Sequence, residues 1–207
     1  MKLFYSPGAC SLGIHVILEE IGAPFEAVRT MIREGANRTP EYLAMNPKGK
    51  VPLLLRDTGR PLTELPAIAV YLARIAPQAH LLPDDPELAA DVMEIVEYIA
   101  ATVHMQGFTR WARPGNFAPD EALHPAVQAR GLEIFQDGLA WLEARLGGRD
   151  FAVGDRFSIA DASMVFIEFW AAERAKLTLP PHLAGHFARM KARPAVQRAF
   201  ATEGLAL

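Results

Sequence analysis

Strand and helix signals alternate along the first 80 residues, and strand signals are absent from the rest of the chain. The apolar residues 3–5 predict a buried strand that Pro7-Gly8 ends, and apolar residues at helical spacing predict a helix from Ser11 to about Ile21. Further strands are predicted at about 25–29, 51–55 and 60–63, followed by a helix at about 64–75. The order β-α-β-α-β-β-α predicts a mixed four-stranded sheet with helices on both faces.

Pro77, Pro83 and Pro86 punctuate the residues that follow this α/β unit. They predict a linker at 78–86 between a domain at 1–77 and an all-α domain at 87–207. Four or five helices are expected in the second domain, the first two at about 87–111 and 120–146. Ser158 and Asp161 resemble a capping box at the start of the third helix, with aspartate in place of glutamate.

The bulk composition excludes several classes of function. A net charge of -3 over 207 residues gives no general attraction to nucleic acid or to an anionic membrane. The chain has no apolar run of about 18 residues and no signal-peptide pattern. Its one cysteine cannot form an internal disulfide. We therefore expect a cytoplasmic protein that binds neither nucleic acid nor membrane, and Cys10 requires an explanation of its own.

Cys10 lies just after the first predicted strand, at the start of the first predicted helix. Unpaired amide groups and the helix dipole at such a position stabilise an anion, which favours a lowered thiol pKa. The same donors would stabilise the thiolate of a bound ligand, and Gly8 allows the backbone to approach it closely. The alternative is that Cys10 is a small buried core residue and Ser11 simply a helix cap.

Two further junctions have both a binding and a structural interpretation. A cis Val51-Pro52 bond would direct the Val51 backbone toward a peptide ligand, whereas a trans bond would merely open a strand. Glu64 precedes a helix that has proline in its first turn. Glu64 and the free amide of Leu65 would suit the ammonium and carboxylate of an amino acid, but Glu64 could also be an ordinary helix cap.

One face of the predicted helix at 87–111 combines polar, small and aromatic residues. Steps of three and four residues align Glu97, His104, Phe108 and Trp111 with two alanines. Such a face suits a cleft for an apolar electrophile. It is also typical of a helix that packs in a core, with His104 as an ordinary hydrogen-bonded histidine.

Taken together, these segments resemble the glutathione transferases, most closely the bacterial beta class, over essentially the whole chain. The resemblance rests on the order and spacing of eight short motifs: Met1-Lys2-Leu3-Phe4-Tyr5, Pro7-Gly8-Ala9-Cys10-Ser11-Leu12, Asn46-Pro47-Lys48-Gly49, Val51-Pro52, Leu62-Thr63-Glu64, His104 before Gly107-Phe108, Ile159-Ala160-Asp161-Ala162 and Arg193-Pro194. It implies a thioredoxin-like first domain, a helical second domain and a homodimer. It also implies glutathione as the cosubstrate of a detoxification enzyme, with no metal.

The resemblance implies a role for each matching residue. Cys10 would face the glutathione sulfur, with His104 beside the thiol. Ser11 is the third predicted catalytic residue, on the ground of its own position at the helix start. The implied glutathione-binding residues are Tyr5, Arg33, Lys50, Val51, Pro52, Glu64, Leu65 and Glu97. Within that set, Val51 would pair with the cysteinyl backbone, Arg33 and Lys50 would contact the glycyl end, and Glu97 would reach the other subunit's ligand. The helix face that they share with His104, and not the resemblance, makes Phe108 and Trp111 the predicted residues of the electrophile side.

The chain departs from the family pattern at three places. The residue after the matched histidine is often lysine in the class, and here it is Met105. Leu65 stands where the family usually has serine or glycine, so the amide is retained without a hydroxyl and with added bulk. An extra residue, Met105 or Gln106, separates His104 from Gly107. We expect a glutathione transferase whose thiolate attacks small apolar electrophiles. The alternatives are a thiol-disulfide or peroxide reductase that uses Cys10 covalently, and a binding protein without catalysis.

Overall fold

The computed structural model describes residues 1–206, and its sheet has four short strands. These are β1 (Lys2–Tyr5), β2 (Glu26–Arg29), β3 (Leu53–Leu55) and β4 (Pro61–Thr63). Their spatial order is β2-β1-β3-β4. β1 is parallel to β2 and antiparallel to β3, which is antiparallel to β4. The mixed sheet predicted from the alternating signals is therefore confirmed.

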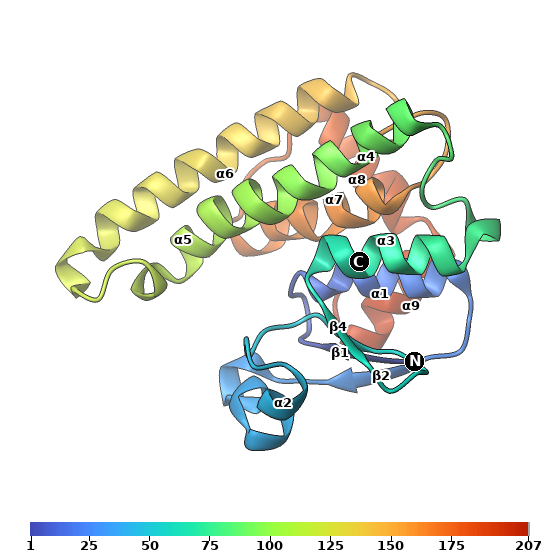
Figure 1. Ribbon diagram of the computed structural model, residues 1–207. Helices are drawn as coiled ribbons and strands as arrows, with labels where there is room; N and C mark the ends of the chain where they lie inside the picture. The colour runs from blue at the N-terminus through green and yellow to red at the C-terminus, as the bar shows by residue number, and fades with distance from the viewer. Residues whose placement is uncertain (207) are drawn as a thin grey trace.

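The two faces of the sheet pack against different helices. α1 (Ser11–Ile21) and α3 (Leu65–Ile75) lie side by side over one face, as Figure 1 shows. α2 (Pro40–Met45) follows two 3-10 turns, η1 (Ile32–Glu34) and η2 (Ala36–Arg38). Because strand side chains alternate, Leu3 joins the main core under α1 while Phe4 joins a smaller cluster with Tyr42 of α2.

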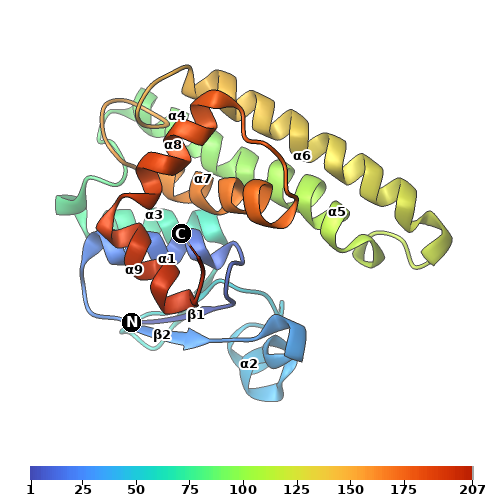
Figure 2. The same cartoon turned by 180° about the vertical axis from the view of Figure 1, so that it is seen from behind.

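The rest of the described chain is helical. It contains α4 (Pro86–Tyr98), η4 (Ile99–Phe108), α5 (Thr109–Ala112), α6 (His124–Leu146), α7 (Ile159–Phe169), η7 (Trp170–Arg174), α8 (Pro181–Lys191) and α9 (Pro194–Glu203), with 3-10 turns at 77–79, 114–116 and 121–123. α7 and α9 both pack on α1, and Figure 2 shows α9 beside it. In residues 1–206 we find no helix of the length and apolar character that a bilayer span requires.

The helix predicted at 87–111 is interrupted by a ten-residue π-helix, η4. Its C-terminal amide, from Thr109, donates to the carbonyl of His104 five residues back. A wider turn of this kind accommodates one more residue than an α-helix between the same two ends. The extra residue that the sequence shows after His104 thus has a structural counterpart. Gly107 allows close packing there, since a Cβ atom would lie 2.9 Å from the Phe135 backbone nitrogen of α6.

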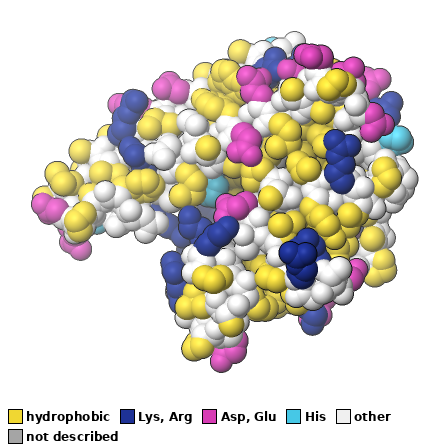
Figure 3. All heavy atoms as spheres, viewed as in Figure 1, with side chains coloured by type: hydrophobic (Ala, Val, Ile, Leu, Met, Phe, Trp, Pro, Cys, Tyr) yellow, Lys and Arg dark blue, Asp and Glu magenta, His cyan; other side chains and the backbone are white. Residues whose placement is uncertain are grey.

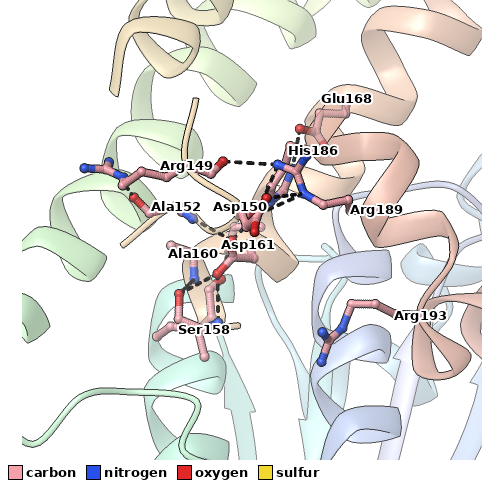
Figure 4. Close-up of polar contacts among 12 residues, drawn as sticks. Arg149, Asp150, Ala152, Ser158, Ala160, Asp161, Glu168, His186, Arg189 and Arg193 are labelled. Carbon is pink, nitrogen blue, oxygen red and sulfur yellow. Dashed lines mark hydrogen bonds and ion pairs between the residues drawn. The ribbon is translucent and has the colours of Figure 1, made fainter. Parts of the chain in front are cut away.

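The start of α7 is fixed by a buried polar network, drawn in Figure 4. The capping box predicted at Ser158 and Asp161 is present, with reciprocal bonds between side chain and backbone. Asp161 also lies 3.1 Å from Nε2 of His186 in α8, and Glu168 lies 2.7 Å from its Nδ1. These two carboxylates hold the pKa of His186 at about 9, despite the opposing effect of burial. The network therefore joins α7 to α8.

Candidate active site

The loop that leads to Cys10 is held by side chains from the helical part of the chain. The Gly8 amide donates to a carboxylate oxygen of Glu203 at 2.7 Å, and the Trp170 indole N–H donates to the Gly8 carbonyl at 2.7 Å. Gly8 has a φ of 65°, in the left-handed region that favours glycine. Both backbone groups of this residue are therefore positioned by α9 and η7. Sequence reasoning missed Glu203 and Trp170, because no local motif marks either one.

Glu203 also connects this loop to the interior of α1. Its second carboxylate oxygen lies 2.9 Å from Nδ1 of His15, and both side chains are fully buried. Burial raises the pKa of Glu203, although its hydrogen bonds with His15 and with Gly8 oppose the shift. The other ring nitrogen of His15 has no hydrogen-bond partner within the described residues. A single carboxylate thus satisfies one buried group in α1 and one in the Cys10 loop.

Cys10 is the N-cap residue of α1, immediately before its first helical residue, and is only 8 % exposed. Its thiol donates to the Val51 carbonyl at 3.6 Å, and the Val51–Pro52 bond is cis, one of the two possibilities left open by the sequence. Burial raises the pKa of the Cys10 thiol to about 12. The backbone amides and nearby cations lower it by less. The expectation of a lowered pKa was therefore wrong, because removal from water outweighs the helix N-terminus here.

Ser11 is the first residue of α1 and not its cap. Its hydroxyl is fully buried, accepts from the Ser6 amide at 3.2 Å and donates to the Ser6 carbonyl at 3.4 Å. The expected capping role falls to Cys10, one residue earlier, because the helical conformation already begins there. The Ser11 hydroxyl closes the loop between β1 and α1.

His104 lies in η4 and contacts two aromatic rings from α7 and η7. Its ring centre is 4.9 Å from that of Trp170 and 6.0 Å from that of Phe166. Burial lowers the pKa of His104 to about 4, with help from the charges of Lys50 and Arg113. The imidazole is therefore neutral at pH 7. It is suited to donating or accepting a hydrogen bond and not to acting as a permanent cation.

Trp170, which contacts His104, forms with Phe108 and Trp111 what we call the aromatic wall. Phe108 stacks on Trp170 with ring centres 4.2 Å apart and contacts Trp111 at 5.4 Å. Figure 3 shows a hollow between the helical part and the sheet-bearing part of the molecule, with a His side chain in it and Lys or Arg side chains beside it. Trp170 belongs to both the wall and the Cys10 loop, since its N–H reaches Gly8.

The junction at Glu64 combines an unusual backbone with an ion pair. Glu64 has a φ of 70°, rare for a residue other than glycine, and its carboxylate pairs with Lys48 at 2.6 Å. Lys48 also donates to the Thr63 hydroxyl at 2.7 Å. The Leu65 side chain is 6 % exposed and packs in the main core. The added bulk of Leu65 is thus directed into the protein.

The other predicted contacts fall into two groups. Arg33, Lys50 and Glu97 have exposed side chains, whereas Tyr5 is 4 % exposed. The Tyr5 hydroxyl donates to the Thr202 carbonyl of α9 at 3.4 Å. The structure thus places the Tyr5 side chain in the core under α9, apart from the exposed residues. Among the residues described, no group of three or more potential ligands is arranged to hold a metal ion.

Comparison with known proteins shows in which family this arrangement occurs. The sequence models of the glutathione S-transferase N-terminal and C-terminal domains match residues 8–75 and 125–200. Glutathione S-transferase GstA of Escherichia coli O157:H7 is 39% identical, over 99% of this chain and 100% of its own length. The chain belongs to the glutathione S-transferase family. The family predicted from the sequence motifs is confirmed.

Solved structures of other glutathione S-transferases share the whole fold. The beta-class enzyme of Sphingomonas chungbukensis is 32% identical, with a TM-score of 0.85 and complete coverage of both chains. A sphingomonad glutathione S-transferase, solved in complex with glutathione, is 33% identical, with a TM-score of 0.81 and complete coverage. These relatives support the beta-like class and confirm the fold, with its α/β sheet unit followed by helices.

Proposed function

We propose that this glutathione S-transferase conjugates the glutathione thiolate to small apolar electrophiles. The observation that carries the proposal is the Cys10 thiol, buried and protonated at the start of α1 beside the Val51 carbonyl. A neutral S–H group in this position is a hydrogen-bond donor for a bound thiolate and a poor nucleophile itself. The glutathione complex of a relative with the same fold supports glutathione as the cosubstrate.

Glutathione would lie across the start of β3 and the start of α3. In this proposal the Val51 backbone pairs with its cysteinyl residue, next to the cis Pro52. Glu64 and the Leu65 amide hold the γ-glutamyl end, for which Glu64 exchanges its bond with Lys48 for the ligand ammonium. Arg33 and Lys50 bind the glycyl carboxylate. The protein acts as a homodimer, in which Glu97 reaches the ligand of the partner chain, and it works in the cytoplasm.

In the reaction the glutathione sulfur forms a bond to an electrophilic carbon, and the leaving group departs with its electron pair. Cys10 donates its S–H to the thiolate, which keeps that sulfur ionised and oriented. His104, neutral at pH 7, provides a further hydrogen bond at the edge of the aromatic wall. The wall itself provides an apolar surface for the electrophile.

The structure weighs against covalent chemistry at Cys10. Only a thiolate attacks a disulfide or a peroxide, and a thiol pKa of about 12 leaves very little thiolate at pH 7. The Val51 carbonyl accepts a hydrogen bond from the thiol, and a carbonyl is not a base that could remove its proton. Conjugation, in which Cys10 stays protonated, is thus the activity that the site supports best.

Steady-state turnover of 1-chloro-2,4-dinitrobenzene with glutathione tests the proposal. We expect the Cys10→Ala enzyme to retain conjugation within about tenfold of the parent, because it loses one weak hydrogen bond. Absence of turnover by the parent enzyme would exclude conjugation and favour a binding protein. Disulfide exchange that is faster than conjugation, and lost in Cys10→Ala, would favour the covalent alternative instead.

A further inference from the structure

Two cations border the same reaction centre from opposite parts of the fold. Lys50 immediately precedes Val51, and Arg113 caps the C-terminus of α5. Both side chains are exposed. Within residues 1–206, no carboxylate forms an ion pair with either of them, whereas Lys48 nearby pairs with Glu64. Lys50 and Arg113 are therefore available to bind an anion.

The charges of these two residues converge on Cys10 and His104. Lys50 and Arg113 both lower the pKa of the Cys10 thiol and of the His104 imidazole. Burial has the larger effect on both groups: it raises the pKa of Cys10 and lowers that of His104. Among the described residues, no carboxylate is a principal cause of either pKa shift. Two cations thus act on the space between these groups. In Figure 3 Lys or Arg side chains lie beside the hollow, and an acidic side chain also lies at its edge.

Arg113 belongs to the electrophile side of this space. It comes two residues after Trp111, on the helix that also carries His104 and Phe108. Its amide donates to the Thr109 carbonyl at 2.8 Å, and its carbonyl accepts from the Asn116 amide at 3.1 Å. The backbone of Arg113 is thus fixed at the end of the aromatic wall. Lys50, in contrast, is joined directly to the residue that pairs with glutathione in the proposed complex.

We propose that Arg113 binds a carboxylate on the electrophile, so that the preferred substrates combine an apolar ring or unsaturated system with an anionic substituent. The aromatic wall holds the apolar part, and the guanidinium pairs with the carboxylate through two parallel N–H bonds. This inference rests on the proposed conjugation reaction and names the substrate class for it. Lys50 serves the glycyl carboxylate of glutathione, which leaves Arg113 as the cation for the second substrate.

Two matched electrophiles separate charge from reactivity. In 4-chloro-3-nitrobenzoate and its neutral isostere 4-chloro-3-nitrobenzamide, the glutathione sulfur forms a bond to the carbon that bears chlorine. The C–Cl bond breaks, chloride leaves with the electron pair, and the thiol proton goes to solvent. The ratio of kcat/KM for benzoate over benzamide, compared between variants, measures recognition of the carboxylate alone.

We expect Arg113→Gln to lower this ratio by about fivefold to tenfold, the effect of losing a charge-assisted hydrogen bond at a partly exposed site. Arg113→Lys should restore much of it, and added salt should lower the ratio in the parent enzyme but not in Arg113→Gln. Arg60→Gln is the matched control. Arg60 precedes β4 and, by strand register, lies at the end of the sheet opposite the Cys10 loop. The ratio of kcat/KM for benzoate over benzamide in Arg60→Gln should equal that in the parent enzyme.

Calorimetry with the two S-aryl glutathione conjugates, carboxylate and carboxamide, gives the same comparison without turnover. A ratio that is unchanged in Arg113→Gln, in kinetics or in conjugate binding, overturns the role of Arg113. If the parent enzyme turns over neither electrophile, the proposed reaction fails. A preference for the carboxylate conjugate that depends on Arg113 would then still uphold the anion site. Lys50→Gln should raise KM for glutathione equally with both electrophiles, and a selective effect on the benzoate would assign the anion to Lys50.

Discussion

Replacing Glu203 by alanine removes the acceptor for two buried groups at once. One is the Gly8 amide at 2.7 Å, and the other is Nδ1 of His15 at 2.9 Å. The Glu203 residue is only 3 % exposed, so water cannot readily take its place. Each buried polar group left without a partner costs about 1–3 kcal/mol. We therefore expect Glu203→Ala to lower the free energy of unfolding by about 2–6 kcal/mol, since two such groups are affected.

Urea denaturation followed by circular dichroism measures this change. Glu203→Gln, which keeps one carbonyl acceptor, should lie between the parent and the alanine variant. Arg198→Ala is the control, because Arg198 lies on the same helix and loses an ion pair with Glu19 in which its own side chain is 53% exposed. Arg198→Ala should lower the free energy of unfolding by no more than about 1 kcal/mol. If Glu203→Ala destabilises the protein no more than Arg198→Ala, the buried carboxylate does not hold the loop in the way inferred here.

Three further predictions concern other residues. Trp170→Phe keeps the stack on Phe108 but loses the hydrogen bond to the Gly8 carbonyl. The kcat/KM for conjugation should therefore fall about twofold to tenfold. An unchanged value would refute a positioning role for Trp170. Iodoacetamide should alkylate Cys10 about a thousandfold more slowly at pH 7 than an exposed cysteine, because burial raises the thiol pKa from 9.0 to about 12; rapid labelling followed by mass spectrometry would contradict this. His186 has a pKa raised from 6.5 to about 9, so its stabilising contribution is complete below pH 6.5 and is lost as the pH rises through 9, by about 3 kcal/mol in total. Urea denaturation at a series of pH values should show that loss of stability in the parent protein and not in His186→Gln.

Local patterns were sufficient to predict the elements that local physics determines. The alternation of apolar stretches and turn residues predicted the four strands, and Ser158 with Asp161 predicted the cap of α7. These features depend on residues close together in the sequence. The extra residue near Met105 was visible as well, but its consequence, the π-helix η4, depends on how both ends of the helix are held by packing.

Properties that depend on distant contacts could not be predicted. The Cys10 pKa was expected to fall because its own helix lowers it, but burial raises it, and the thiol contacts Val51, 41 residues away in the sequence. Glu203 and Trp170 reach Gly8 across 195 and 162 residues, a distance over which a single sequence carries no pairing signal. The Leu65 side chain was expected beside the ligand, and only the packing of α3 shows that it lies in the core.

Calorimetric titration of the protein with glutathione tests the central claim most directly. A site made by the Val51 backbone, Glu64, the Leu65 amide and Lys50 predicts saturable binding with one glutathione per chain. The affinity should weaken in Lys50→Gln and in Glu64→Gln, since each loses a charge that is opposite to a charge on the ligand. No heat of binding at millimolar glutathione would contradict the assignment of this cleft to glutathione.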